Sequence, residues 1–222
     1  MPTSTTPHAA PLPRLSGVVY SALLNDPRQL LDLGHAAHRP PYKAPPQHPV
    51  LAVRPRNTLV GDGQAIAVPA DGVRTGASLG LVIGRTACRV AEADAHAHIA
   101  GYLLANDLCL PMQGDARHYR PAARQMARDG FCPLGTPVPA ASVAHPDDLQ
   151  IRLQIDGQPV WTTRTAGRVR SVARLLSDVT DFMTLQPGDV LLLGISASAP
   201  IALPGQTMVV AIDGLGQLRN TL

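Results

Sequence analysis

The sequence of 222 residues contains a single lysine, Lys43, and a single glutamate, Glu92. A metal site built on paired glutamates therefore cannot form within this chain, and a Schiff-base or general-base lysine could only be Lys43. Aromatic residues make up 3% of the chain, which leaves little material for stacking nucleic-acid bases. The net charge of +3 is mild and the arginines form no dense patch. We therefore expect no nucleic-acid partner, whereas a small anionic molecule fits this charge.

The chain also lacks the signals of export, disulfide formation and membrane insertion. Its three cysteines are widely spaced and form no Cys-x-x-Cys motif, which favours reduced thiols over a disulfide or a zinc site. Residues 1–17 are polar and Pro-rich, without the apolar core of a signal peptide. The longest apolar run, near Leu191, is interrupted by Gly194, Ser196 and Pro200. We expect a cytoplasmic protein without a membrane partner.

Composition divides the chain into two parts. Residues 1–48 form a small N-terminal segment with a weak strand at 17–20 and a short helix at 30–37. It ends in a Pro-rich stretch at 39–49, which predicts an extended linker because proline lacks the backbone donor and fixes φ. Residues 49–222 are expected to form the main domain.

Strand signals dominate this main domain. Short apolar runs bounded by Gly, Pro or Asp predict strands at 50–53, 65–68, 79–83 and 189–193. Two hairpins are predicted at 149–165 and 208–219, around Asp156-Gly157 and Asp213-Gly214, since Asp-Gly suits a tight turn. Helices are predicted at 92–100 and 169–183, the second from apolar residues at 3.6-residue spacing. The expected fold class is α+β, mostly β.

Several motif-like stretches have simpler explanations. Asp94-Ala-His96-Ala-His98 suggests metal binding, but residues two apart on a helix point in different directions, so we interpret it as exposed helix surface. Gly61-Asp-Gly63 is too short for a phosphate loop and predicts a turn. No serine lies in a Gly-x-Ser-x-Gly elbow, so no nucleophilic triad is indicated.

Two segments place charged residues directly beside apolar or aromatic residues. Tyr102-Leu-Leu-Ala-Asn-Asp107 places a carboxylate at the end of an apolar strand, where it must be hydrogen-bonded, ion-paired or bound to a cation. Arg128-Asp-Gly-Phe-Cys-Pro133 places an Arg-Asp pair before an aromatic residue and a proline. From the residues alone, each segment could be structural or functional.

An ordered set of motifs over about residues 50–222 resembles the fumarylacetoacetate hydrolase family. The set comprises Arg54-Pro-Arg-Asn-Thr58, Leu79-Gly-Leu-Val-Ile-Gly84, Gly101-Tyr-Leu-Leu-Ala-Asn-Asp107, Asp129-Gly-Phe-Cys-Pro-Leu-Gly135 and Pro187-Gly-Asp-Val190. The predicted helix ending Val-Thr-Asp-Phe-Met183 and the tail Asp213-Gly-Leu-Gly-Gln-Leu-Arg-Asn220 are similar to one branch. That branch contains the bifunctional isomerase/decarboxylases of 4-hydroxyphenylacetate (homoprotocatechuate) degradation, and the similarity is to their first half or first subunit.

The resemblance implies a mixed β-sandwich roll with flanking helices, which is usually dimeric. In active family members a Mg²⁺ or similar ion is held by a Glu-x-Glu pair and a later Asp, and it chelates an acidic 2-oxo substrate. Asp107 matches that Asp, but the Glu pair falls on Gly76 and Ser78. Other charged or loop positions of the family fall on Pro111, Gly114, Met126 and Gly194-Ile-Ser-Ala197. We therefore expect no metal in this chain.

The resemblance leaves three functions open. The first is a subunit of an isomerase/decarboxylase acting on 5-oxopent-3-ene-1,2,5-tricarboxylate and 2-hydroxyhepta-2,4-diene-1,7-dioate. It would work as a homodimer or as a heteromer with a homologous metal-binding subunit. The second is a catalytically silent partner. The third is an acylpyruvate-type C–C hydrolase, but Glu92 cannot replace the missing Glu pair of the metal site.

For the isomerase, motif position suggests the roles of six residues. Asp107 or Asp129 is the candidate proton carrier. Arg56 and Arg128 would hold substrate carboxylates through bidentate hydrogen bonds, with Asn57 and Thr58 as polar orienting groups.

Overall fold

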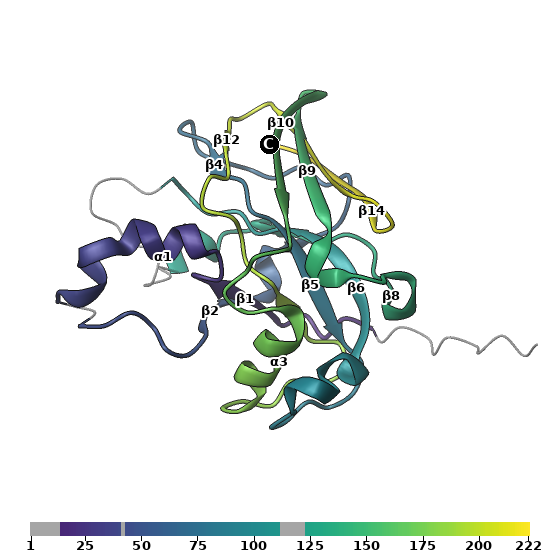
Figure 1. Ribbon diagram of the computed structural model, residues 1–222. Coiled ribbons are helices and arrows are strands. Elements are labelled where there is room, and N and C mark those ends of the chain that lie inside the picture. Colours follow the sequence, from purple (N-terminus) through teal and green to yellow (C-terminus); the bar gives the residue numbers. More distant parts are fainter. Residues whose placement is uncertain (1–13, 41–42, 112–122) are drawn as a thin grey trace, which may run out of the picture.

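The computed structural model of the protein describes residues 14–40, 43–111 and 123–222 (Figure 1). Its largest sheet has six strands in the order β2 (Val50–Arg54), β1 (Val19–Leu23), β11 (Val190–Leu192), β5 (Ala77–Ile83), β6 (Ile99–Asn106) and β8 (Val138–Pro139). Only β1 and β11 pair in parallel; the other neighbours are antiparallel. The expected mostly-β α+β class is confirmed.

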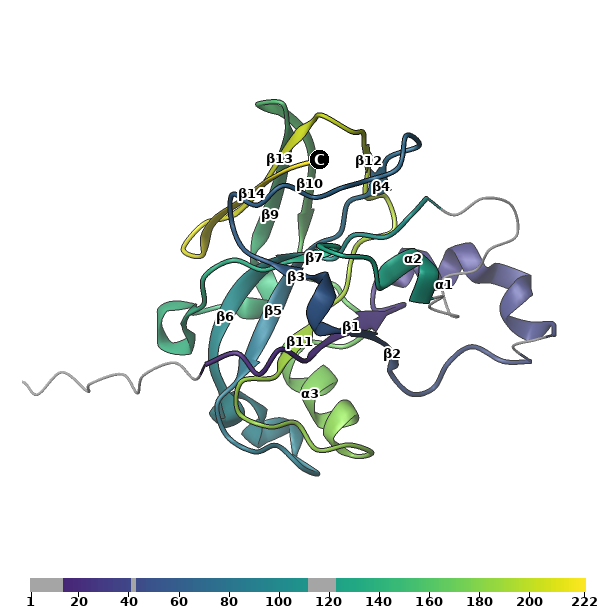
Figure 2. The same cartoon turned by 180° about the vertical axis from the view of Figure 1, so that it is seen from behind.

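Three smaller sheets complete the β structure. A four-stranded sheet has the order β10 (Gln158–Arg164), β9 (Gln150–Ile155), β13 (Thr207–Ile212) and β14 (Gly216–Thr221). Two pairs join β12 (Ile201–Ala202) to β4 (Val73–Arg74), and β3 (Leu59–Val60) to β7 (Cys132–Pro133). Figure 2 shows the same arrangement from behind, including β3 and β7.

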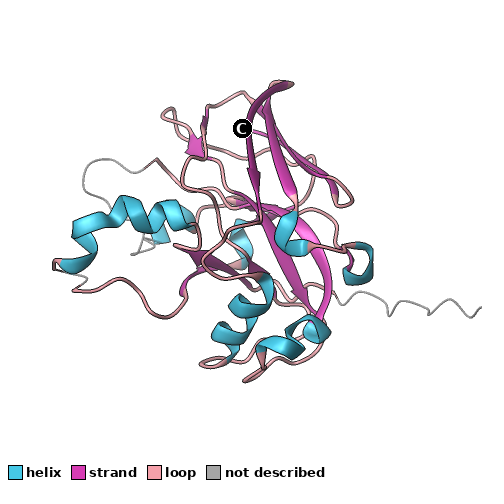
Figure 3. Cartoon of the chain, viewed as in Figure 1, coloured by secondary structure: helices cyan, strands magenta, loops and turns pink. Residues whose placement is uncertain are grey.

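Helices are short and lie around the sheets (Figure 3). The α-helices are α1 (Pro27–Leu33), α2 (Ala123–Met126) and α3 (Val172–Thr180). The 3₁₀ turns are η1 (Gly34–His38), η2 (Arg56–Thr58), η3 (Glu92–His98), η4 (Ala140–Ser142) and η5 (Pro146–Asp148). In the described ranges, no helix is both long enough and apolar enough to cross a bilayer.

Burial on both faces explains why β5 is apolar apart from Ser78. All seven residues of β5 are buried, because the strand is covered on both faces. Leu79, Leu81 and Ile83 point into the main core, which also contains the buried face of α3. Val82 points to the opposite face, into a second cluster with Leu103. This alternation fixes the register of the strands that carry the site described below.

The N-terminal segment takes part in the main sheet. The strand predicted at 17–20 is β1, and it lies between β2 and β11. Through β1, the N-terminal segment therefore shares the main sheet with the predicted domain 49–222. The helix predicted at 30–37 begins earlier, as α1, where the side chain of Asp26 accepts a hydrogen bond from the backbone of Arg28.

Three local predictions differ from the structure. The stretch 92–100 is not an α-helix: its first seven residues form the 3₁₀ turn η3, and Ile99 starts β6 opposite Ile83. The stretch 65–68 is not a strand, since only Ala65 makes an isolated bridge, to Thr221. The helix predicted at 169–183 is the shorter α3, which starts after Ser171 because that side chain caps it.

Candidate functional site

The candidate site forms where β5 and β6 bring residues 76–78 beside residues 105–107. Ser78 pairs with Ala105, and the Asp107 amide donates to the Gly76 carbonyl at 2.8 Å. The Asn106 side chain accepts a hydrogen bond from the Gly76 amide at 2.7 Å. These contacts hold the ends of β5 and β6 together and exclude solvent from Asp107, which is 1% exposed.

The carboxylate of Asp107 is ion-paired with Arg54 and accepts a hydrogen bond from the Ser21 hydroxyl. Both partners come from the β1–β2 pair. Arg54 lies opposite Val19, so it shares a sheet face with Ser21, two residues further along β1. The prediction that a carboxylate at this strand end requires a partner is confirmed.

Arg54 is itself fully buried, and its guanidinium joins three segments of the chain. One nitrogen donates to the Leu108 carbonyl at 2.9 Å, and another donates to the Met126 carbonyl. Arg54 belongs to the motif Arg54-Pro-Arg-Asn-Thr58, but the motif does not identify it as the partner of Asp107. The available signal was a lone charge at the end of the apolar strand Val-Leu-Ala-Val-Arg54.

The residues at this position do not fit the divalent ion of the family. A Cβ on Gly76 would overlap the backbone carbonyl of Asp107, so position 76 cannot carry a ligand side chain in this backbone. Ser78 is buried and exchanges hydrogen bonds with the Gly194 backbone at 3.1 and 3.2 Å. The positive charge beside Asp107 already belongs to Arg54, which would repel a cation. Mg²⁺ also prefers several oxygen ligands, and one carboxylate does not supply them.

Nowhere in ranges 14–40, 43–111 and 123–222 do three or more His, Cys, Asp or Glu side chains converge as a metal site would require. His96 is exposed, and His98 places Nδ1 3.1 Å from the Thr86 carbonyl. Cys88, Cys109 and Cys132 are free thiols.

The second predicted segment begins as an exposed turn at Arg128 and Asp129 and then runs into the buried strand β7. Asn57 donates to Asp129 at 2.7 Å and to the Ala127 carbonyl at 3.2 Å, which brings two of the predicted residues together. Arg128 stacks over Phe131, with its guanidinium carbon 5.7 Å from the ring centre. It also lines a cavity of about 440 Å³ together with Asp71, Arg124 and Gln125.

The remaining predicted residues do not join that exposed turn. Thr58 is buried, and its hydroxyl donates to the Pro55 carbonyl at 2.8 Å, so it stabilises the η2 turn. Arg56 is exposed, with its guanidinium beside Gly17. The structure therefore separates the six predicted residues into a buried carboxylate, the η2 turn and the exposed turn, and these do not form one pocket.

The chain belongs to a known family. Residues 18–222 match the domain described as "Fumarylacetoacetate (FAA) hydrolase C-terminal". A similar curated protein is the 4-hydroxyphenylacetate degradation bifunctional isomerase/decarboxylase of Escherichia coli, 40% identical over 207 residues. That match covers 93% of this chain but 47% of the relative, so the chain spans about half the length of that protein.

Other relatives include an isomerase and a tautomerase. A mitochondrial oxaloacetate tautomerase of Oryza sativa is 31% identical over 183 residues, covering 77% of this chain and 78% of the relative. The crystal structure of 5-carboxymethyl-2-hydroxymuconate delta-isomerase from Mycobacterium smegmatis matches with a TM-score of 0.75 and 29% identity. It covers 94% of this chain and 79% of the solved chain.

A further solved structure is similar over most of the chain. It is 2-hydroxyhepta-2,4-diene-1,7-dioate isomerase from Mycobacterium marinum, with a TM-score of 0.71 and 26% identity, over 95% of this chain and 75% of that one. Isomerases and a tautomerase thus recur among the proteins that this chain resembles.

Proposed function

We propose that this chain is the isomerase half of a two-part isomerase/decarboxylase of aromatic catabolism, and that it works without a metal ion of its own. The observation that carries the proposal is the buried Arg54–Asp107 pair, which puts a guanidinium where metal-dependent relatives need a cation. The 40% identity to half of a bifunctional enzyme supports the pathway and the division into two parts.

The two reactions of such an enzyme make different demands on the site. Loss of CO₂ from 5-oxopent-3-ene-1,2,5-tricarboxylate leaves an electron pair that a Lewis acid stabilises, and we assign this step to a homologous metal-bearing subunit or half. Isomerisation of 2-hydroxyhepta-2,4-diene-1,7-dioate transfers one proton from the enol oxygen to carbon, while the double bonds shift to an unsaturated 2-oxo acid. Positioned acid/base groups suffice for that transfer.

The two candidate proton carriers differ in access. Asp107 is buried and held by Arg54 and Ser21, whereas Asp129 is exposed and bonded to Asn57. The test is dienol turnover by the complex with its metal-bearing partner, using Asp107→Asn and Asp129→Asn, with the exposed Asp213→Asn as a control. Loss of an acid/base group lowers turnover by about 100-fold or more. Unchanged turnover in both variants would show that neither is the proton carrier.

A second candidate function is a silent partner subunit that contributes an interface. It is favoured by the same ion pair, which leaves Asp107 without a free oxygen for substrate chemistry. The purified chain alone, assayed with the dienol in Mg²⁺ and in EDTA, separates the two. Turnover that survives EDTA supports the metal-free isomerase, and no turnover in either condition supports the silent partner. Turnover only with Mg²⁺ would contradict the metal-free site.

Cytoplasmic location and pairing, with a second copy or with a homologous metal-binding subunit, are part of the proposal. An acylpyruvate-type hydrolase is disfavoured because that chemistry uses the divalent ion that Gly76, Ser78 and Arg54 do not accommodate.

A further inference from the structure

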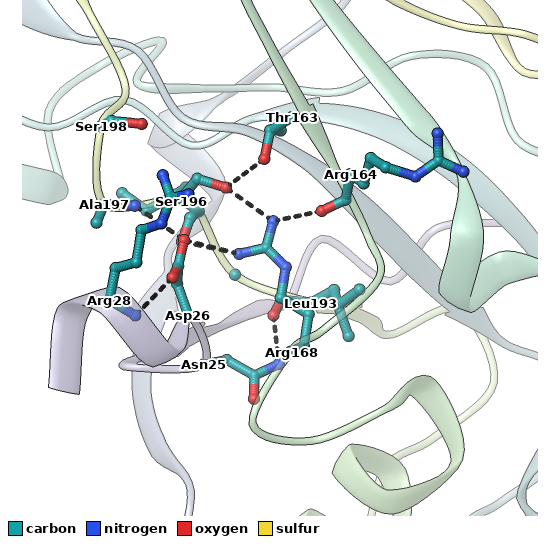
Figure 4. Close-up of polar contacts among 12 residues, drawn as sticks. Asn25, Asp26, Arg28, Thr163, Arg164, Arg168, Leu193, Ser196, Ala197 and Ser198 are labelled. Atoms are coloured by element: carbon teal, nitrogen blue, oxygen red, sulfur yellow. Dashed lines mark hydrogen bonds and ion pairs between the residues drawn. The ribbon is translucent and has the colours of Figure 1, made fainter. Parts of the chain in front are cut away.

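A second cavity, of about 370 Å³, lies between the start of α1 and the segments around residues 162–168 and 196–198. None of the six residues predicted from motifs lines it. Its polar lining includes Asp26, Arg28, Thr163, Arg168 and Ser196 (Figure 4). Its volume is within the range of small-molecule sites, roughly 300–1,000 Å³.

Asn25 fixes the walls of this cavity. Its side chain donates to the Leu193 carbonyl at 2.8 Å and to the Arg170 carbonyl at 3.1 Å, and it accepts from the Arg170 amide at 2.8 Å. These three bonds tie the start of α1 to the end of β11 and to the segment before α3. The cavity is therefore bordered by structure that is held together independently of a ligand.

Arg168 is a buried cation whose charge is only partly compensated. The side chain is 4% exposed, and its nitrogens donate to the Ser196 hydroxyl at 3.0 Å and to the carbonyls of Arg164 and Ile195 at 3.2 and 3.3 Å. Its Nε has no hydrogen-bond partner among the described residues. The nearest carboxylate oxygen, of Asp26, is 3.6 Å away, too far for a direct hydrogen bond.

The charges that face Arg168 leave an excess of positive charge. Asp26 is already engaged, because its oxygens accept from the backbone amides of Arg28 at 2.9 Å and Ala197 at 3.1 Å. Arg28 is exposed, and its side chain extends toward Ser196 (Figure 4). Arg164 turns away to bind Asp148 at 2.9 Å. Burial lowers the pKa of Arg168, and Asp26 opposes this only in part.

We propose that this cavity binds a small dicarboxylic acid, with the buried Arg168 holding one carboxylate and the exposed Arg28 meeting the other. The hydroxyls of Ser196 and Thr163, 2.8 Å apart, add donors beside the Arg168 guanidinium. Charge-assisted hydrogen bonds from arginine to carboxylate are among the stronger contacts that proteins make. The identity of the acid as the dienol substrate rests on the proposed function; the binding site does not.

The experiment is calorimetric titration of the full chain with heptanedioate, the saturated seven-carbon diacid, and with its neutral diamide. Heptanedioate is expected to bind at least about 10-fold more tightly than the diamide, because only the diacid supplies carboxylates. Arg28→Gln is expected to weaken heptanedioate binding by about 10-fold without loss of fold, since this side chain is exposed. Arg168→Gln is expected to weaken it at least as much, and thermal unfolding shows whether that variant remains folded.

Arg152→Gln is the matched control, because this arginine pairs with Asp213 and does not line the cavity. Equal binding of diacid and diamide would overturn the site, as would an Arg28→Gln protein that binds heptanedioate like the control. Dienol turnover by the reconstituted complex is measured separately. If heptanedioate binds but the complex has no turnover, the proposed function is refuted and the diacid-binding site still stands. If the complex turns over the dienol but heptanedioate does not bind, the diacid-binding site is refuted.

Discussion

The buried pair of Arg54 and Asp107 makes a quantitative prediction about stability. Replacing Arg54 with Met removes the guanidinium but keeps an unbranched apolar side chain of similar length. Asp107 then keeps only the Ser21 hydroxyl, and the carbonyls of Leu108 and Met126 lose their donor. The Arg54→Met variant therefore contains a buried carboxylate without a cation.

Breaking a buried ion pair on one side costs about 3–5 kcal/mol, because an uncompensated charge stays inside. Arg54 and Asp107 are 0% and 1% exposed, so solvent screening does not reduce that cost. For a chain of 222 residues, each kcal/mol corresponds to roughly 2–4 °C in Tm. Arg54→Met is therefore expected to lower Tm by about 6–20 °C.

The assay is thermal and urea unfolding followed by circular dichroism, with two comparison variants. Arg54→Met combined with Asp107→Leu is expected to regain most of the lost stability, because apolar pairs can replace buried ion pairs at little cost. Arg152→Met, which removes an exposed partner of Asp213, is expected to leave Tm unchanged. An Arg54→Met protein that melts within about 2 °C of the wild type would refute the dependence of Asp107 on Arg54.

Three further predictions concern the same region and the thiols. Gly76→Ala is expected to lower Tm by about 10 °C or prevent folding, since its Cβ would overlap the Asp107 carbonyl, whereas Gly61→Ala, which meets nothing within 4 Å, leaves Tm nearly unchanged. Mass spectrometry after iodoacetamide treatment at pH 8 is expected to find the exposed Cys88 alkylated and Cys132 protected until unfolding, because burial excludes reagent and raises the pKa of Cys132. Adding Mg²⁺ or EDTA is expected to shift Tm by less than about 1 °C, as a ligand stabilises only a state that binds it; a larger shift would indicate a bound ion.

Elements determined by local chemistry were predictable from sequence. The turn at Asp156-Gly157 has φ angles of 51° and 76°, the positive values that this dipeptide favours, and the hairpin of β9 and β10 follows from it. The cap at Ser171 and the spacing of apolar residues in α3 are equally local. The prediction at 92–100 was wrong because Ile99 pairs with Ile83 in the sheet, and that non-local contact ends the η3 turn.

The candidate site was predictable only in part, for the same reason. The sequence shows that Asp107 needs a partner, because the residues before it are apolar. It does not show that the partner is Arg54, since this depends on the register of β1 against β2 and on the position of that pair beside β6. The cavity of Arg168 is harder still to predict. Asp26, Arg168 and Ser196 belong to three distant segments. Only Ser196 lies at a family motif position, where the family's residues are replaced.

The position of β1 also has a consequence for how the chain is made. A ribosome synthesises β1 early and β11 late, yet β1 lies between β2 and β11 in the sheet. Until Val190–Leu192 has left the ribosome, the nascent sheet keeps one open edge on β1 and another on β5, which also pairs with β11. Open strand edges recruit other chains, so this part of the protein is most exposed to aggregation before β11 has emerged. A three-residue strand thus closes the sheet from both sides at once.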